Sequence, residues 1–389
     1  MRHFIQLLQL LTITIAVMAG SSVQAGVLKN VILLIGDGLG FEHVNAAAAY
    51  AGERMFFESF PYQGEVTTHS ADDAITDSAA GGTAIATGHK VNNGVVSMAL
   101  PGDGSDLPTM LEVAKSEGKQ VGMVTTSNLL DATPAAFAAH TSSRDNFAEI
   151  LFDMFLESQP HVLMGGGSSI FGNPALAPLL GVGGYTLVAD RDEMYALDTD
   201  AETMVLGHFA PDHLPYEYDG MGNAPHLSEM TEVALDLLDN NPNGFFVMIE
   251  GAKIDKASHD NDLERTIFEV LEFDNAVRKA FEWADGRDDT LIIVTADHET
   301  GGLLMLADNG PGNMPTVYWG TEDHSAVNVP VYAWGVNAHL IPPVMDNTGF
   351  FNLIHLGQAP APVVPEPASL AIFALGLGLL AAGRHVRRK

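Results

Sequence analysis

Carboxylate and imidazole side chains follow several apolar runs of the sequence, near the point where each run ends. These residues are Asp37, Glu250, Asp297 and His298. A single acidic residue after a strand is usually a cap or turn residue, but the same pattern at several strand ends favours a shared site. Oxygen and nitrogen ligands suit Zn²⁺ or Mg²⁺, and the sequence contains no cysteine that could make a thiolate site. The pattern therefore predicts a divalent metal centre.

A second group of potential ligands lies in the segment that follows Glu250. Asp255 and His259 are four residues apart, so one helical turn would place both side chains on the same face, as two ligands of one ion. This spacing alone is a weak indication, because it also occurs in helices that bind no metal. His324 is a candidate third ligand for the same ion, although taken alone it would more often be a hydrogen-bonded loop histidine.

The segment 76–83, Thr-Asp-Ser-Ala-Ala-Gly-Gly-Thr, contains the candidate nucleophile Ser78. Its small residues allow close approach of a ligand, and a helix beginning here would direct backbone N–H groups towards a bound phosphate. A serine hydroxyl needs a base or a metal to become a good nucleophile, and the sequence has no Gly-x-Ser-x-Gly motif to indicate a hydrolase triad. Metal activation is the remaining route. The local pattern alone is also explained if Ser78 or Asp77 only caps the helix.

Two further segments contain residues that suit phosphate or metal binding. In the segment Asp131-Ala-Thr133-Pro134, a helix cap at Thr133 followed by proline explains the pattern without any function. Arg144 is notable because arginine is scarce in this chain, and a planar guanidinium can bind two phosphate oxygens at once. The alternative for Arg144 is a structural ion pair.

The elements that must position these residues alternate along the chain. Continuous apolar runs at 31–35, 120–125, 245–249, 291–295 and 329–334 predict buried strands. Helices are expected over 107–117, which contains Pro108 and ends at Gly118, and over 261–284, which has one apolar stripe. We therefore expect an α/β fold with a central, largely parallel β-sheet flanked by helices on both faces. Ligands of such sheets bind beyond the carboxyl ends of the strands.

Composition excludes several classes of protein. The 389 residues include 18 Lys and Arg against 49 Asp and Glu, which gives a net charge of -31. Phosphates would meet negative charge over most of this surface, so no nucleic acid is expected as a partner. A hydrophobic content of 47% with only 17% charged residues excludes an acidic disordered chain. The chain is expected to hold a large folded core.

The two ends of the chain have the composition of targeting segments. Residues 1–25 have a basic start, an apolar stretch and a small residue suited to cleavage, which predicts a secretory signal peptide. Residues 26–357 would form the catalytic domain, with a loop-rich insertion at about 165–225. Residues 358–389 contain a Pro/Ala-rich spacer, Pro365-Glu366-Pro367, an uncharged run over 368–383 and a basic end.

This C-terminal segment resembles a PEP-CTERM sorting signal, which implies processing by an exosortase-type system. The protein would then be exported to a periplasmic, cell-surface or extracellular location and be anchored transiently in the membrane. A plain C-terminal membrane anchor is the alternative.

Taken together, the internal motifs resemble those of the bacterial alkaline phosphatase family from residue 31 to about residue 334. The motifs that carry the resemblance are Gly-Asp37-Gly, Thr-Asp77-Ser78-Ala-Ala, Asp131-Ala-Thr133-Pro, Arg144, Glu250-Gly-x-x-Ile-Asp255-x-x-x-His259, Thr-Ala-Asp297-His298 and His324. The resemblance implies two Zn²⁺ and one Mg²⁺ per chain. One zinc would be held by Asp255, His259 and His324, and the other by Asp37, Asp297 and His298.

The resemblance also implies roles for the remaining residues. Thr133 and Glu250 would complete the magnesium site, which Asp37 bridges and which Asp131 contacts directly or through water. Ser78 would attack phosphorus and form a phosphoserine. Arg144 would bind the phosphate oxygens, and Asp77 would orient that arginine.

The activity implied by the resemblance is hydrolysis of small-molecule phosphate monoesters with release of inorganic phosphate, in a protein that could form a homodimer. The alternatives are a phosphodiesterase or a sulfatase of the same superfamily. A third alternative, of a different class, is a non-enzymatic acidic surface protein that sequesters cations.

Overall fold

The apolar runs of the sequence form the middle of a large β-sheet in the computed structural model, which describes residues 27–171, 184–357 and 359. Within these residues the strands are β1 (Asn30–Gly36), β2 (Tyr62–Thr67), β3 (Gln120–Asn128), β4 (Val162–Gly166), β5 (Thr186–Val188), β6 (Val205–His208), β7 (Phe245–Gly251), β8 (Thr290–Thr295), β9 (Glu299–Thr300), β10 (Leu304–Ala307), β11 (Thr316–Tyr318), β12 (His324–Ser325), β13 (Val329–Gly335) and β14 (Val344–Asp346). Every residue of β1, β7 and β8 is buried, as the uninterrupted apolar pattern predicts.

Ten of these strands form the central sheet in the spatial order β14-β2-β13-β8-β1-β7-β3-β4-β6-β5. β1 lies between β7 and β8 and is parallel to both. β13 is antiparallel to its neighbours β2 and β8, whereas the other pairs of the sheet are parallel. The expectation of an α/β fold with a largely parallel central sheet is therefore confirmed. Two small antiparallel pairs, β10 with β11 and β9 with β12, lie outside the sheet.

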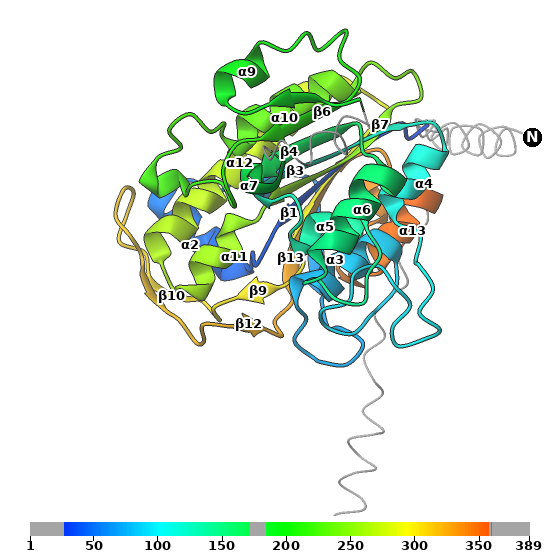
Figure 1. Ribbon diagram of the computed structural model, residues 1–389. Coiled ribbons are helices and arrows are strands. Elements are labelled where there is room, and N and C mark those ends of the chain that lie inside the picture. The colour runs from blue at the N-terminus through cyan, green and yellow to red at the C-terminus, as the bar shows by residue number, and fades with distance from the viewer. Residues whose placement is uncertain (1–26, 172–183, 358, 360–389) are drawn as a thin grey trace, which may run out of the picture.

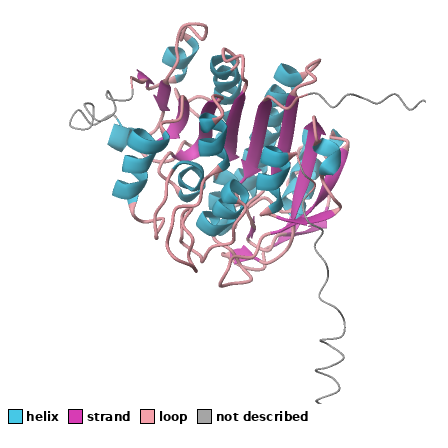
Figure 2. Ribbon diagram, turned by 90° about the vertical axis from the view of Figure 1, so that its right-hand side faces the viewer, coloured by secondary structure: helices cyan, strands magenta, loops and turns pink. Residues whose placement is uncertain are grey.

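Helices cover both faces of the sheet (Figure 1). Their bounds are α2 (Phe41–Ala51), η1 (Phe56–Ser59), α3 (Ser78–Thr87), α4 (Met110–Ser116), α5 (Ala132–Ala138), α6 (Phe147–Phe152), η2 (Asp153–Ser158), α7 (Ser168–Phe171), α9 (Arg191–Tyr195), η3 (Glu217–Asp219), α10 (Leu227–Leu238), α11 (Lys253–His259), α12 (Leu263–Ala284), η4 (Ala338–Leu340) and α13 (Gly349–Leu356). α2, α10 and α12 pack on one face, and α3, α4, α5 and α13 on the other. Figure 2 shows the strands side by side, with loops gathered below them.

Capping interactions place the helix starts slightly later than the sequence pattern predicts. The helix expected from residue 107 begins at Met110, because Thr109 is the cap: its hydroxyl accepts from the Glu112 N–H while the Glu112 carboxylate accepts from the Thr109 N–H. Pro108 therefore precedes the helix. Asp262 caps α12 by accepting a hydrogen bond from the Arg265 N–H.

The segment at about 165–225, which we expected to be a loop-rich insertion, contributes to the sheet. β5 and β6 add two parallel strands beyond β4. All four residues of β6 are buried, so their burial against β4 outweighs the high Gly and Pro content of the segment. The structure does not describe residues 172–183.

The expected signal peptide lies outside the described residues, and so does all of the expected C-terminal segment 358–389 except residue 359. Among the helices of the described ranges, none combines the length and the apolar character needed to cross a bilayer. The uncharged run at 368–383 is not part of those ranges.

His140 connects elements on the α4 side of the sheet and offers a test of this packing. Its Nδ1 lies 2.8 Å from the Ser97 carbonyl oxygen and its Nε2 lies 2.9 Å from Glu112 Oε1. Burial alone would lower the pKa of His140, but the hydrogen bonds to Glu112 and Ser97 outweigh burial and raise the pKa from 6.5 to about 9. The imidazolium form is therefore favoured in the folded state.

We predict that His140→Gln lowers the free energy of unfolding by about 1–2 kcal/mol at pH 6. A folded-state pKa above the ordinary value gives a contribution that is complete below about pH 6.5 and is lost as the pH rises through about 9. Urea unfolding at pH 6 and pH 9.5 measures the difference, with the exposed His339→Gln as control. An effect of the same size at both pH values would contradict the prediction.

Candidate active site

The register of three adjacent strands brings the candidate ligands together. Ile35 of β1 is paired with Glu250 of β7 on one side and with Thr295 of β8 on the other. Asp37 follows β1 directly, and Asp297 lies two residues beyond β8. Because the three strands are parallel, their carboxyl ends meet at one edge of the sheet, where the sequence predicted the site.

Asp255, His259 and His324 form one group, in which a ligand atom of each lies within 4.8 Å of the others. Asp255 and His259 lie on one face of α11, with His259 Nε2 3.3 Å from Asp255 Oδ1. His324, at the start of β12, places its Nε2 3.5 Å from Asp255 Oδ1 and 3.0 Å from His259 Nε2. Its Nδ1 lies 2.8 Å from the Thr76 carbonyl oxygen, which fixes the ring and directs Nε2 into the group.

Asp37, Asp297 and His298 form a second group that meets the same spacing, and all three are buried. His298 Nε2 lies 3.3 Å from Asp37 Oδ1 and 3.3 Å from Asp297 Oδ2. The two groups adjoin, because the rings of His298 and His324 are stacked with centroids 3.6 Å apart. The structure thus assembles the same two sets of three residues that the family resemblance pairs with two metals.

Three buried oxygen atoms in this region have no hydrogen-bond partner among the described residues: Asp37 Oδ1, Asp297 Oδ2 and Thr133 Oγ1. Buried oxygens are almost always hydrogen-bonded, so these atoms are arranged to contact something other than a donor of the chain. Divalent cations would satisfy these atoms. The donor set, made of carboxylates, imidazoles and a hydroxyl, therefore fits Zn²⁺ and Mg²⁺.

The electrostatics of these carboxylates supports the same fit. Burial, reinforced by the charges of neighbouring carboxylates, raises the pKa of Asp37 well above its ordinary value and that of Asp297 to about 7. Burial likewise raises the pKa of Glu250 to about 8. For Asp255 the hydrogen bond from His324 and the nearby imidazoles outweigh burial and lower its pKa. Cations at this position would hold all four groups as carboxylates.

Glu250, Thr133 and Asp131, expected to form a third site, differ in their surroundings. Glu250 is buried and accepts hydrogen bonds from the hydroxyls of Thr125 and Ser127. Asp131 instead faces cationic side chains, with Oδ1 3.3 Å from an Arg144 nitrogen and Oδ2 3.0 Å from Lys256 Nζ. Both Asp131 oxygens thus have partners within the chain.

Ser78 begins α3, as the small-residue pattern predicts, and Asp77 is the N-cap. The Asp77 side chain accepts hydrogen bonds from the Ala80 N–H and, at 3.1 Å, from Arg144 Nη1. The same carboxylate therefore caps α3 and orients Arg144. Ser78 is 4% exposed, and its Oγ lies 3.1 Å from His298 Nε2. The candidate nucleophile is therefore held beside the second group of ligands.

Further residues surround the site that the sequence pattern did not indicate. Among them are Thr125, Ser127, His213 and Thr300. The Thr300 hydroxyl donates to Asp255 Oδ1 and lies 3.3 Å from His298 Nδ1, so it orients both groups. Thr125 is the register partner of Glu250, a relation that the sequence does not reveal before strand pairing is known.

Gly38 allows the chain to pass close to α11 between the two ligand groups. Its φ of +75° favours glycine, and a Cβ added there would lie 2.9 Å from the Asp255 Cα.

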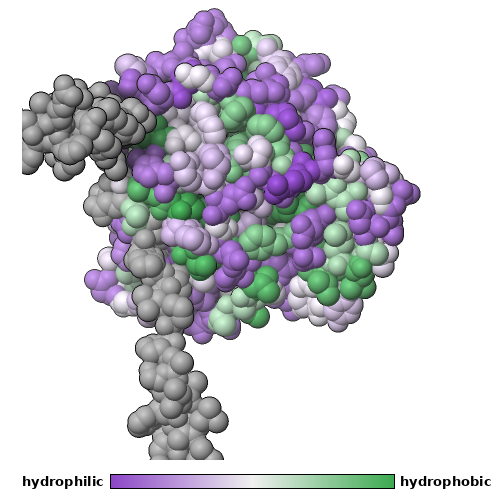
Figure 3. All heavy atoms as spheres, turned by 180° about the vertical axis from the view of Figure 1, so that it is seen from behind, coloured by the Kyte–Doolittle hydropathy of each residue, from purple (hydrophilic) through white to green (hydrophobic). Residues whose placement is uncertain are grey.

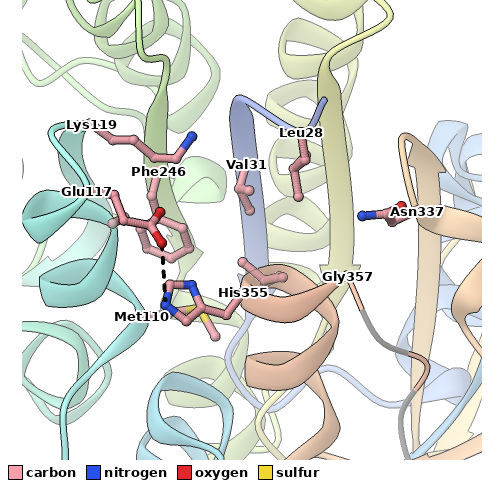
Figure 4. A pocket seen from close by; sticks show the side chains of 11 residues that line it. Leu28, Val31, Met110, Glu117, Lys119, Phe246, Asn337, His355 and Gly357 are labelled. Atoms are coloured by element: carbon pink, nitrogen blue, oxygen red, sulfur yellow. Dashed lines mark ion pairs between the residues drawn. The ribbon is translucent and has the colours of Figure 1, made fainter. Parts of the chain in front are cut away.

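A separate cavity of about 260 Å³ lies at the opposite, amino ends of the strands (Figure 4). That cavity is lined by residues such as Leu28, Phe246 and His355 and is remote from the candidate ligands in the topology of the sheet.

The chain is similar to known protein families and to curated proteins over most of its length. Residues 28–313 match the alkaline phosphatase family, and residues 363–389 match the PEP-CTERM protein-sorting motif. Alkaline phosphatase 3 of Bacillus subtilis is 38% identical over 297 residues, which cover 72% of this chain and 63% of that protein. Streptomycin-6-phosphate phosphatase of Streptomyces griseus is 33% identical over 404 residues, which cover 84% of this chain and 89% of the relative.

Solved structures are similar over most of the chain. Alkaline phosphatase from the Antarctic bacterium TAB5 is 30% identical, with a TM-score of 0.77 over 84% of this chain and 97% of that one. The Thermus thermophilus alkaline phosphatase is 25% identical, with a TM-score of 0.76 over 90% and 96% of the two chains. With its fold, its motifs and its ligand groups in agreement, this chain belongs to the alkaline phosphatase family.

Proposed function

We propose that the protein is an exported, metal-dependent alkaline phosphatase that hydrolyses phosphate monoesters through a phosphoserine on Ser78. The observation that carries the proposal is the position of Ser78 Oγ, 3.1 Å from His298 Nε2 and beside two three-residue groups suited to divalent cations. Membership of the family supports the reaction class.

Two Zn²⁺ ions are proposed for the groups Asp255–His259–His324 and Asp37–Asp297–His298, and one Mg²⁺ for Glu250 and Thr133. When bound, these cations would lower the pKa of the Ser78 hydroxyl and stabilise negative charge on the phosphoryl oxygens. A variant of the TAB5 enzyme has been solved with Mg bound in its M3 site. Asp131 already contacts Arg144 and Lys256, so we propose that it supports the magnesium site through water.

The residues of the chain would act as follows. Ser78 Oγ attacks phosphorus, the bond from phosphorus to the ester oxygen breaks, and the alcohol leaves. Arg144 uses two guanidinium N–H groups on Asp77 and Asp131, which leaves further donors for the phosphate oxygens and holds the planar group in place. Water then attacks the phosphorus of the phosphoserine, releasing phosphate and restoring Ser78.

The chain also carries the proposed address for export. The match of residues 363–389 to the PEP-CTERM motif supports recognition by an exosortase-type system. We propose that residues 1–25 are removed as a signal peptide, that 26–357 form the catalytic domain, and that 358–389 anchor the protein in the membrane until they are processed. The mature protein would act in the periplasm, at the cell surface or outside the cell.

We further propose that a second copy of the chain covers an apolar surface beside α2. This surface consists of the exposed side chains of Phe41, Leu304, Leu306 and Tyr318. Leu304 and Tyr318 are paired between β10 and β11, and the Met305 N–H donates to Glu42 of α2. Figure 3 shows hydrophobic residues gathered at the lower right of the molecule, the side on which β10 lies. Exposed apolar side chains in one patch favour association.

Replacing Ser78 with alanine should lower turnover of an aryl phosphate by about a thousandfold or more, because the nucleophile is removed. The melting temperature should stay close to that of the parent protein. Steady-state rates measure turnover, and mass spectrometry of the peptide that contains Ser78 detects the phosphoserine in the parent protein. Ser116→Ala, which changes an exposed serine, is the control. Turnover near that of the parent would contradict the phosphoserine proposal. If the parent protein hydrolyses a bis-aryl phosphate or an aryl sulfate faster than an aryl phosphate, phosphodiesterase or sulfatase activity is favoured instead.

Metal removal should make stability depend on pH. Burial raises the pKa of Glu250 to about 8 and of Asp297 to about 7, so without cations the folded state retains protons that the unfolded state has lost. The metal-free protein should therefore lose stability as the pH rises from about 4 to about 8. Calorimetry at pH 5.5 and pH 8.5 measures the slope, and restored Zn²⁺ and Mg²⁺ should flatten it. Equal slopes with and without metals would rule out this account.

Charge introduced into the apolar surface should separate a dimer. We expect light scattering after size exclusion to give twice the chain mass for the parent and the mass of one chain for Leu306→Asp combined with Tyr318→Asp. Tyr195→Asp, which changes an exposed tyrosine of α9, is the matched control and should stay dimeric. A monomeric parent protein would refute the dimer.

A further inference from the structure

A third group of potential metal ligands lies outside the active site. Glu217 in η3, His226 at the start of α10 and Glu272 on α12 place one ligand atom each within 4.8 Å of one another. This is the spacing that the two active-site groups also meet, and the group shares no residue with them. α10 and α12 lie side by side on one face of the sheet (Figure 1).

The three side chains are held in place from different elements. His226 Nδ1 lies 2.7 Å from Glu217 Oε2. The Glu272 carboxylate accepts from the Ser228 N–H at 2.8 Å and from Asn275 Nδ2 at 3.0 Å. The Glu217 N–H in turn donates to Glu269 Oε1 at 2.8 Å, which fixes the backbone of η3 against α12. The group is thus preorganised, and each carboxylate oxygen that accepts one hydrogen bond keeps a second lone pair for a cation.

One oxygen of the group has no partner. Glu217 Oε1 is fully enclosed and makes no hydrogen bond among the described residues, although the other oxygen of the same carboxylate is paired with His226. The Glu217 side chain is 11% exposed, and Glu272 is 8% exposed. An enclosed carboxylate oxygen without a donor is costly, and a cation removes that cost.

The neighbouring cationic side chains are engaged elsewhere. Arg191 pairs with Glu229 at 2.8 Å, and Arg265 pairs with Asp219 at 2.8 Å. Lys253 Nζ lies 3.5 Å above the ring of Tyr216. Among the described residues, His226 is the only basic side chain within ion-pair distance of Glu217, and none is within that distance of Glu272. The Glu217 carboxylate is therefore paired with one imidazole, and the Glu272 carboxylate has no cationic partner among these residues.

We propose that Glu217, His226 and Glu272 bind a structural Zn²⁺ ion. Two carboxylate oxygens and one imidazole nitrogen are a donor set that zinc accepts, with water as the fourth ligand. Tetrahedral ligands about 2.0–2.2 Å from zinc lie roughly 3.4 Å apart, which small side-chain rotations reach from the observed spacing. The ion would tie η3 and the start of α10 to α12, and so fasten the end of the segment that carries β5 and β6.

The test compares zinc content in the parent protein and in Glu217→Gln combined with His226→Gln. Each protein is stripped with chelator, incubated with Zn²⁺ alone, dialysed and measured by plasma mass spectrometry. We expect the double variant to hold one zinc per chain fewer than the parent, and to show a smaller zinc-dependent rise in melting temperature, with turnover of an aryl phosphate within about twofold of the parent. As a control, Glu264→Gln removes an exposed carboxylate of α12, the helix that also carries Glu272, and should leave the zinc content unchanged.

A double variant that binds as much zinc as the parent, with the same rise in melting temperature, would overturn the proposal and leave a metal-independent ion pair. If the double variant does not fold, Glu272→Gln gives the same comparison, because glutamine can still accept from the Ser228 N–H. Measuring zinc content after adding His324→Ala to the variant distinguishes zinc lost from this site from zinc lost from the active site. The proposal requires the two losses of zinc to be additive, and it stands or falls independently of the proposed activity.

Discussion

Repulsion between carboxylates enclosed at one edge of the sheet is the constraint on which the rest of this structure depends. The register of β1 with β7 and β8 brings Asp37, Glu250 and Asp297 together at positions that are at most 5% exposed. Like charges in a medium of low dielectric constant repel strongly, and burial already raises the pKa values of all three groups. Such an arrangement is stable as carboxylates only if cations are placed among them.

This constraint explains why the surroundings of the site are built as they are. The Thr125 and Thr300 hydroxyls donate to Glu250 and Asp255, so part of the charge is stabilised by the chain itself. Arg144 and Lys256 face Asp131 instead, and Arg144 also contacts Asp77, which precedes Ser78 in the chain. The chain carries a net charge of -31, so its overall field repels phosphate. Attraction of a phosphate must therefore come from the site itself, that is, from Arg144 and from the cations proposed for the two ligand groups.

The sequence predicted the parts of the site that depend on local spacing. The strand ends gave Asp37 and Asp297, the four-residue interval placed Asp255 and His259 on one helix face, and the small residues marked the start of α3 at Ser78. The family resemblance, not the spacing, divided these ligands into two groups. The largely parallel sheet also followed from the alternation of apolar runs and helices.

Features that depend on long-range pairing were not predictable. Thr125 supports Glu250 only because β3 and β7 are paired in one register, and the cluster of Glu217, His226 and Glu272 needs three elements to pack together. The last two strands of the sheet, β6 and β5, were missed because β6 forms by pairing with β4, and β5 by pairing with β6, rather than from local propensity.

If cations occupy the two ligand groups at the carboxyl ends of the strands, they can be located there by their scattering. Anomalous diffraction from crystals of the protein, recorded on both sides of the zinc absorption edge, tests this occupancy most directly. We expect one peak between Asp255, His259 and His324 and a second between Asp37, Asp297 and His298. A fully active protein whose crystals show no anomalous peak at either position would contradict it.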